Sequence, residues 1–144
     1  MRKYLLDTNV LSEIKKGAGG DQGVFTWYSS IEESNLFISV ISLGEILRGV
    51  VLIQHKDPVK SKFINAWYCD LVLRFSERII GIDQHTMETW AKLPCRRTIP
   101  PFDSLLAATA SSKGFIMVTR NVSDFLDTGV EVLNPFSAPP QSIR

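Results

Sequence analysis

The stretch K-Y-L-L-D-T-N-V-L-S-E-I, from Lys3 to Ile14, decides the fold. Its apolar residues Tyr4 to Leu6 predict a short strand, and the apolar repeat that begins at Val10 predicts a helix directly after it. Asp7 lies between the two. Open α/β sheets place their ligands at the carboxyl ends of the strands, so we expect Asp7 to border a functional site.

Strand and helix signals alternate along the rest of the chain. Further strands are predicted at Leu36 to Ile41, Arg78 to Ile82, Phe115 to Thr119 and Val130 to Leu133; further helices are predicted at Val24 to Ile31, from Ser42, from Asp57 to about Phe75, at Gln84 to Leu93 and at Phe102 to Lys113. This alternation predicts an α/β fold, in which helices flank a parallel sheet. Residues 1–136 are expected to form one domain, and residues 137–144 an irregular tail.

Composition restricts the class of protein. A chain of 144 residues fits one domain, and a net charge of +1 indicates neither a nucleic-acid nor a membrane partner. No apolar run approaches the roughly 20 residues that span a bilayer. Cys69 and Cys95 are isolated, so we expect small half-buried residues rather than metal ligands. Without a secretory leader, a soluble cytoplasmic protein is predicted.

Besides Asp7, three acids follow predicted strands or begin predicted helices: Glu45, Asp103 and Asp124. Each has a purely structural interpretation. Asp7 is placed to cap its helix, and Ser42 with Glu45 has the spacing of a capping box. Asp103 lies in a first helical turn, where the helix dipole favours an anion, and Asp124 is placed to cap or end a turn.

Taken together, the acids indicate a different role. Parallel topology brings the carboxyl ends of the strands to one edge of the sheet, where carboxylates about 4 Å apart repel by about 4 kcal/mol per pair. A divalent cation offsets that repulsion, and an oxygen-only ligand set favours Mg²⁺ or Mn²⁺ over Zn²⁺. Such an ion activates water and stabilises charge on a phosphoryl oxygen. Phosphodiester hydrolysis is therefore the predicted reaction class.

Other chemistries lack their residues. The chain has two histidines, His55 and His85, and both are expected on the surface. We find no G-x-S-x-G elbow and no glycine motif that cradles a nucleotide. A phosphatase of the haloacid dehalogenase type needs a second acid where Asn9 stands, and a receiver domain needs an acidic pair and a late lysine. A binding domain whose acids only cap helices remains open.

Five segments carry a resemblance to a known family. They are L-L-D-T-N-V-L-S-E (Leu5 to Glu13), I-S-V-I-S-L-G-E-I-L-R-G (Ile38 to Gly49), P-F-D-S-L-L-A-A-T-A (Pro101 to Ala110), V-T-R-N-V-S-D-F (Val118 to Phe125) and G-V-E-V-L-N-P-F (Gly129 to Phe136). In this order they resemble the PIN-domain family, and within it the VapC and FitB-like ribonuclease toxins of bacterial type II toxin–antitoxin modules. The long middle helix is covered least.

The resemblance implies a three-layer PIN-like fold with a parallel five-stranded sheet, and a metal-dependent ribonuclease. By motif match, Asp7, Glu45 and Asp103 would hold Mg²⁺, with Mn²⁺ as a substitute. Asp124 would be the fourth acid. The resemblance also implies an RNA substrate, a homodimer, and a cognate antitoxin that places a peptide or a basic side chain in the acidic groove.

Further residues around the acids take roles from the same match. Asn9 would steady Asp7, while Thr119 and Asn121 would orient water, metal ligands or substrate. Arg120 is a candidate phosphate contact, and other basic candidates for the rim are Arg48, Lys92, Arg96 and Arg97. A PIN-like DNA nuclease and a non-catalytic domain that binds metal or a partner are the alternatives.

Overall fold

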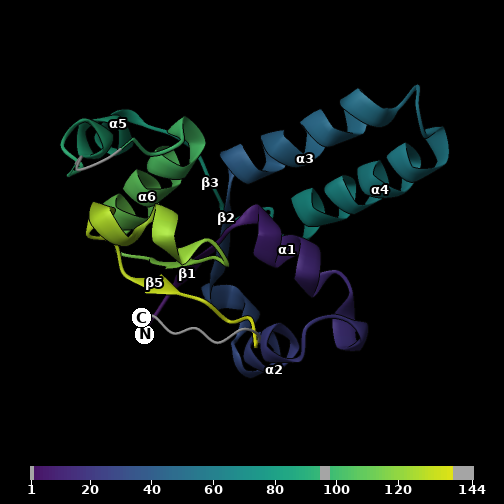
Figure 1. Ribbon diagram of the computed structural model, residues 1–144, viewed down its shortest axis with the longest axis horizontal. Helices are drawn as coiled ribbons and strands as arrows, with labels where there is room; N and C mark the ends of the chain where they lie inside the picture. Colours follow the sequence, from purple (N-terminus) through teal and green to yellow (C-terminus); the bar gives the residue numbers. More distant parts are fainter. Residues whose placement is uncertain (1, 95–97, 138–144) are drawn as a thin grey trace.

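The computed structural model describes residues 2–94 and 98–137. Within them five parallel strands form one sheet in the order β3-β2-β1-β4-β5 (Figure 1). The strands are β1 (Tyr4–Leu6), β2 (Leu36–Ser39), β3 (Ile79–Ile80), β4 (Ile116–Val118) and β5 (Val132–Leu133). The predicted α/β fold with a parallel five-stranded sheet is thus confirmed, with β1 at its centre.

Helices follow the strands as the alternation predicted. They are α1 (Thr8–Ile14), α2 (Gln22–Ser30), α3 (Val40–Ile53), α4 (Pro58–Arg74), α5 (Gln84–Ala91) and α6 (Pro101–Lys113), with single 3-10 turns at Gly17–Gly19, Glu33–Asn35, Val122–Asp124 and Leu126–Thr128. None of the helices in the described ranges is both long and apolar enough to cross a lipid bilayer.

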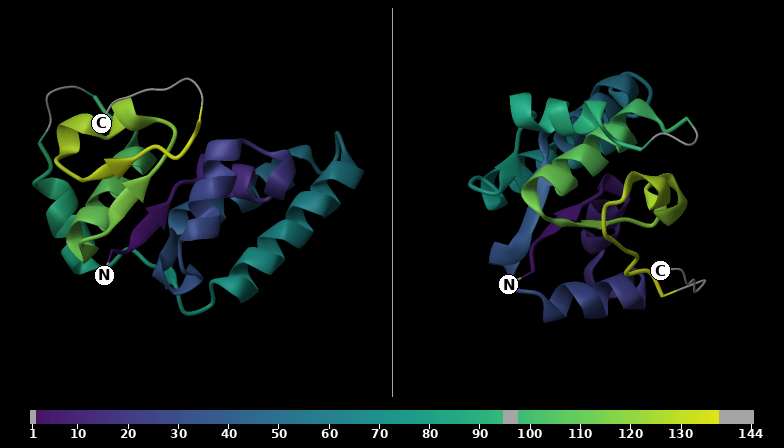
Figure 2. Two further views of the ribbon diagram at one scale, coloured as in Figure 1. Left: turned by 90° about the horizontal axis from the view of Figure 1, so that it is seen from below. Right: turned by 90° about the vertical axis from the view of Figure 1, so that its left-hand side faces the viewer.

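The central strands are buried on both faces, as parallel sheets require. Successive residues of β1 point to opposite sides, so Leu6 joins a core cluster with residues of α1, α3 and α4, whereas Leu5 joins a second cluster with α6. Met117 of β4 packs on the same side as Leu5, and Val118 on the side of Leu6. The result is the predicted three-layer arrangement, in which helices cover both faces of the sheet (Figure 2).

Strand β2 ends earlier than its sequence suggests. The apolar run to Ile41 predicts a strand, but α3 begins at Val40, and the Ser39 hydroxyl caps it by accepting a hydrogen bond from the Ile41 backbone N–H at 3.0 Å. Ser42 is therefore inside the helix, fully buried. The capping box of Ser42 and Glu45 is wrong, because the cap is one turn earlier.

Helices α3 and α4 form an antiparallel pair that extends beside the sheet (Figure 1). Leu71 of α4 is buried in the core, but Phe63 of the same helix is 73% exposed. Cys69 is also exposed, so the expected half-buried position is wrong for this residue. Cys95 lies outside the described residues.

Candidate active site

Asp7 follows β1 and caps α1, and both positions come from the local sequence. Asp7 is a buried residue, 6% exposed. It accepts hydrogen bonds from the Thr8 backbone N–H at 2.7 Å and from the Thr119 hydroxyl at 2.8 Å, while the Asn9 amide lies 3.4 Å away. Burial raises the pKa of Asp7 and outweighs the lowering by the Thr119 and Thr8 hydrogen bonds. Asp7 is thus a fixed carboxylate at the centre of the sheet edge.

Glu45 reaches the same edge from the second turn of α3. The Thr8 hydroxyl donates a hydrogen bond to Glu45 Oε1 at 2.7 Å, so one threonine contacts both acids through its backbone N–H and its side chain. Sequence reasoning missed Thr8. The sequence places Thr8 between Asp7 and Asn9, but it does not indicate that the Thr8 hydroxyl points toward Glu45.

Asp103, in the first turn of α6, and Asp124, in the 3-10 turn after β4, complete the cluster. Burial raises the pKa of the Asp103 carboxyl to about 6. The negative charges of Asp7, Asp124 and Glu45 add to this shift, as does a hydrogen bond between the side chains of Asp103 and Asp124. The four predicted acids therefore share one electrostatic environment, although they come from four separate segments.

The loop after β4 holds the remaining predicted residues. Thr119 is fully buried, and its hydroxyl oxygen accepts a hydrogen bond from the Asn121 backbone N–H at 3.0 Å. The Asn9 side-chain oxygen accepts one from the Arg120 backbone N–H at 3.2 Å. Asn9 therefore connects Asp7 to this loop, and its role in steadying the carboxylate stays a prediction.

The basic residues that were predicted for the rim differ in their surroundings. The Arg120 guanidinium lies over the Phe136 ring, 4.8 Å from its centroid, so an aromatic side chain fixes it. Arg48 and Lys92 are exposed, whereas Arg96 and Arg97 lie outside the described residues. No lysine or arginine in the ranges 2–94 and 98–137 forms an ion pair with any of the four acids.

The donor chemistry fits Mg²⁺ or Mn²⁺, because the cluster offers carboxylate and hydroxyl oxygens. Three acids already spaced as a complete metal cage do not occur in the described part of the chain. Mg²⁺ is usually held by one or two carboxylates together with water, and a cation at Asp103 and Asp124 would replace the hydrogen bond between them. The residues therefore suit a hydrated divalent ion.

An apolar groove of about 720 Å³ adjoins the acids. Glu45 and Arg48 lie in its wall, and Phe102, which precedes Asp103, is 54% exposed beside them. The groove continues along α3 to Leu52, which is 63% exposed. The acidic site thus lies next to an apolar surface that no described residue of the same chain covers.

The fold and this site define a class: α/β proteins with an acidic, oxygen-rich site at the carboxyl edge of a parallel sheet. Residues 4–130 match the PIN domain family model. The chain therefore belongs to the PIN-domain family, as the motifs indicated.

Two curated relatives cover nearly the whole chain, and a third covers about half of it. A VapC ribonuclease of Sinorhizobium fredii is 28% identical over 92% of this chain and 96% of its own length. The toxin FitB of Neisseria gonorrhoeae is 26% identical over 92% and 97%, respectively. A VapC ribonuclease of Mycobacterium tuberculosis is 38% identical over 49% of this chain and 68% of that protein.

Solved structures resemble the fold closely. FitAcB from Neisseria gonorrhoeae has a TM-score of 0.78 at 27% identity, covering 92% of this chain and 97% of that one. FitAB bound to a DNA fragment has a TM-score of 0.77, also at 27% identity, over 92% of this chain and 94% of that one. The chain is therefore similar, over its whole domain, to toxins crystallised in toxin–antitoxin complexes.

Proposed function

We propose that this protein is a Mg²⁺-dependent endoribonuclease and the toxin of a bacterial toxin–antitoxin pair, with Mn²⁺ as a substitute ion. The observation that carries the proposal is the convergence of Asp7, Glu45, Asp103 and Asp124: burial, together with the charges of the other three acids, raises the pKa of Asp103 to about 6. Relatives named VapC ribonuclease support RNA as the substrate class.

The chain's own residues fix the geometry of the reaction. Thr119 and the Thr8 backbone N–H orient the Asp7 carboxylate, and the Thr8 hydroxyl orients Glu45. Asn9 ties this arrangement to the loop after β4. The Asp7 and Glu45 carboxylates are thus held before substrate arrives, which lowers the cost of assembling the site.

When bound, Mg²⁺ supplies positive charge that offsets the carboxylates and the phosphoryl oxygens and makes a bound water more acidic. A carboxylate of the cluster then accepts the proton of the attacking water. Basic side chains at the rim contact the RNA phosphates, and their contribution falls as the salt concentration rises.

The proposed partners are a cognate antitoxin and a second copy of the chain. Solved relatives are toxin–antitoxin complexes, which supports the antitoxin. The uncovered apolar groove along α3 supports a homodimer. A cytoplasmic location stays a prediction from the sequence.

Cleavage of an RNA panel tests the proposed function. We expect the wild type to cleave with Mg²⁺ or Mn²⁺ and to stop with EDTA. Asp7→Asn and Asp103→Asn should each lose activity by at least about 100-fold, more than outer-shell changes usually cause. Asp70→Asn, which removes an exposed acid on α4, is the matched control and should keep full activity.

The same assay separates the alternatives. Cleavage that persists both with EDTA and in the two variants would contradict a carboxylate-held metal. Cleavage of single-stranded DNA but not of RNA would identify a PIN-like DNA nuclease. A metal-induced rise in melting temperature without any cleavage would indicate a non-catalytic binding domain.

A further inference from the structure

The C-terminal segment is fastened to the start of α2. Asp21, the N-cap of α2, accepts a hydrogen bond from the Val24 backbone N–H at 3.0 Å. The same carboxylate accepts hydrogen bonds from the Ser137 backbone N–H at 2.9 Å and from its hydroxyl at 2.7 Å. One side chain therefore caps a helix and holds a residue 116 positions later in the sequence.

Gly23 shows how closely the segment lies against α2. A Cβ atom at this position would come within 2.5 Å of the Pro135 carbonyl oxygen and 2.6 Å of the Ser137 backbone nitrogen. These are backbone atoms that cannot rotate away, so only glycine fits. The right-hand view of Figure 2 shows the segment descending from β5 to α2.

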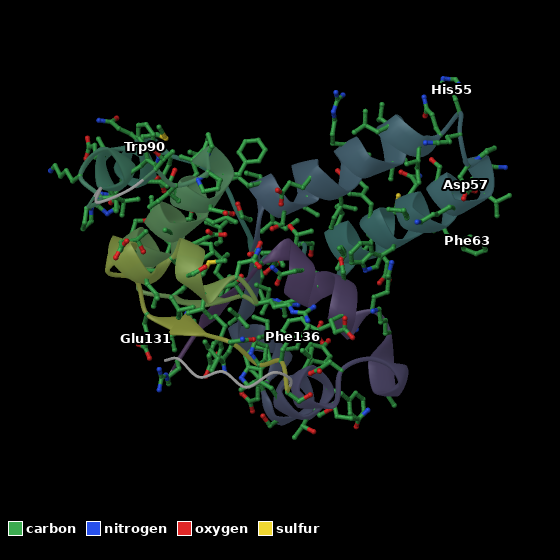
Figure 3. All side chains as sticks on the ribbon, in the orientation of Figure 1. His55, Asp57, Phe63, Trp90, Glu131 and Phe136 are labelled. Carbon is green, nitrogen blue, oxygen red and sulfur yellow. The ribbon has the colours of Figure 1, made fainter. Side chains whose placement is uncertain are left out.

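Phe136 directly precedes the fastened Ser137 and contacts Arg120, a residue of the loop after β4. Phe136, labelled in Figure 3, is partly buried against the core. Its backbone N–H donates a hydrogen bond to the Asn134 side-chain oxygen at 3.0 Å. Its ring lies 4.8 Å from the guanidinium carbon of Arg120. The Arg120 backbone is held at its other side by Asn9. The Arg120 backbone is thus tied through Asn9 to the Asp7 carboxylate, while its guanidinium is held by Phe136.

We infer that Phe136 is a positioning residue for Arg120, whose guanidinium then contacts a substrate phosphate beside the carboxylates. This inference rests on the proposed ribonuclease function. A guanidinium stacked on a ring by its face keeps its N–H edge free for a phosphate. No carboxylate of the described residues forms an ion pair with Arg120. A prearranged side chain also loses less conformational entropy when RNA binds.

The test measures KM and kcat for a short single-stranded RNA. Arg120→Ala should raise KM roughly tenfold, as expected for one charged hydrogen bond, with kcat at saturation unchanged. Phe136→Leu should raise KM roughly threefold through the lost stacking contact, and Phe136→Tyr, which keeps the ring, should restore it. Phe63→Leu, at an exposed phenylalanine on α4, is the control and should leave KM unchanged.

The double variant tests whether Phe136 affects KM through Arg120. Because Phe136 acts through Arg120, Arg120→Ala with Phe136→Leu should have the KM of Arg120→Ala alone. Binding of labelled RNA in EDTA gives an independent readout: the slope of affinity against salt should fall by about 0.7 in Arg120→Ala, the value for one phosphate on a single strand.

Asp21→Asn provides a second route if Phe136→Leu fails to fold. It weakens the attachment of Ser137 but keeps the ring and a helix cap, and should raise KM in the same direction. If the wild type cleaves RNA and these variants leave KM unchanged, the phosphate contact of Arg120 and its positioning by Phe136 are overturned, while the proposed ribonuclease function stands. If the wild type neither binds nor cleaves RNA, the proposed function fails and this inference fails with it.

Discussion

At the residue scale, the pKa of Asp103 depends on the burial of its carboxyl and on the charges of the other three acids. Its pKa is raised from 3.8 to about 6, first by burial and then by Asp7, Asp124 and Glu45. Between these pH values the folded state binds a proton that the unfolded state releases. The contribution of protonated Asp103 to the free energy of unfolding is therefore complete below pH 3.8 and is lost as the pH rises through about 6.

This sign gives a prediction for the metal-free protein. In EDTA, Asp103→Asn should gain melting temperature relative to the wild type as the pH rises from 4 to about 6, and the difference should then stay constant. Thermal melts across that range measure it. Asp70→Asn should show no such trend, and equal slopes for Asp103→Asn and the wild type would contradict the assigned shift.

Thr119 provides a second prediction at this scale. Thr119→Val keeps the shape of a fully buried side chain but removes the donor to Asp7. Because a hydrogen bond to a buried charge is lost, the free energy of unfolding should fall by about 1.5–3 kcal/mol. Urea denaturation measures it, and Thr119→Ser should recover most of the loss. A change below about 0.5 kcal/mol, the usual surface value, would disprove this role.

The sequence was informative about these residues for a simple reason. Acids that directly follow buried strands or open helices have their backbone positions set by topology, so the convergence of Asp7, Asp103 and Asp124 could be predicted. The hydroxyl of Thr8 and the stacking of Arg120 on Phe136 could not. They depend on side-chain rotamers and on contacts between residues far apart in the chain.

At the element scale, the start of α3 decides where Glu45 points. The β-branched run that continues to Ile41 favours a strand in any local pattern, but Ser39 caps the helix before that run ends. Local propensity therefore placed this boundary wrongly, since a serine cap and tertiary packing override it. Strand edges elsewhere were also predicted too long: β3 covers only Ile79–Ile80 and β5 only Val132–Leu133.

Two serine variants test the position of this cap. Ser39→Ala should cost about 1 kcal/mol of stability, because the Ile41 N–H loses its acceptor. Ser42→Ala should be neutral or stabilising, since the buried Ser42 hydroxyl has no hydrogen-bond partner in the described structure. Chemical denaturation of both variants gives the comparison, and the reverse order of stabilities would restore the capping box.

At the scale of the whole molecule, the apolar groove along α3 predicts a homodimer. Leu52→Asp places a charge in this groove, where the side chain is 63% exposed in one chain. If a second copy covers the groove, burying that charge should convert the dimer to a monomer. Size-exclusion chromatography with light scattering measures the mass. Val59→Asp, at a 65% exposed site on α4, should stay dimeric, and a monomeric wild type would remove this part of the account.

The central claim is that four distant acids create one divalent-cation site, and metal-dependent melting tests it most directly. Adding Mg²⁺ or Mn²⁺ at 100 times its dissociation constant should stabilise the wild type by about 2.7 kcal/mol. Asp7→Asn and Asp103→Asn should lose that gain, whereas Asp70→Asn should keep it. A wild type whose melting temperature does not respond to either ion, or variants that respond as strongly as the wild type, would contradict the account.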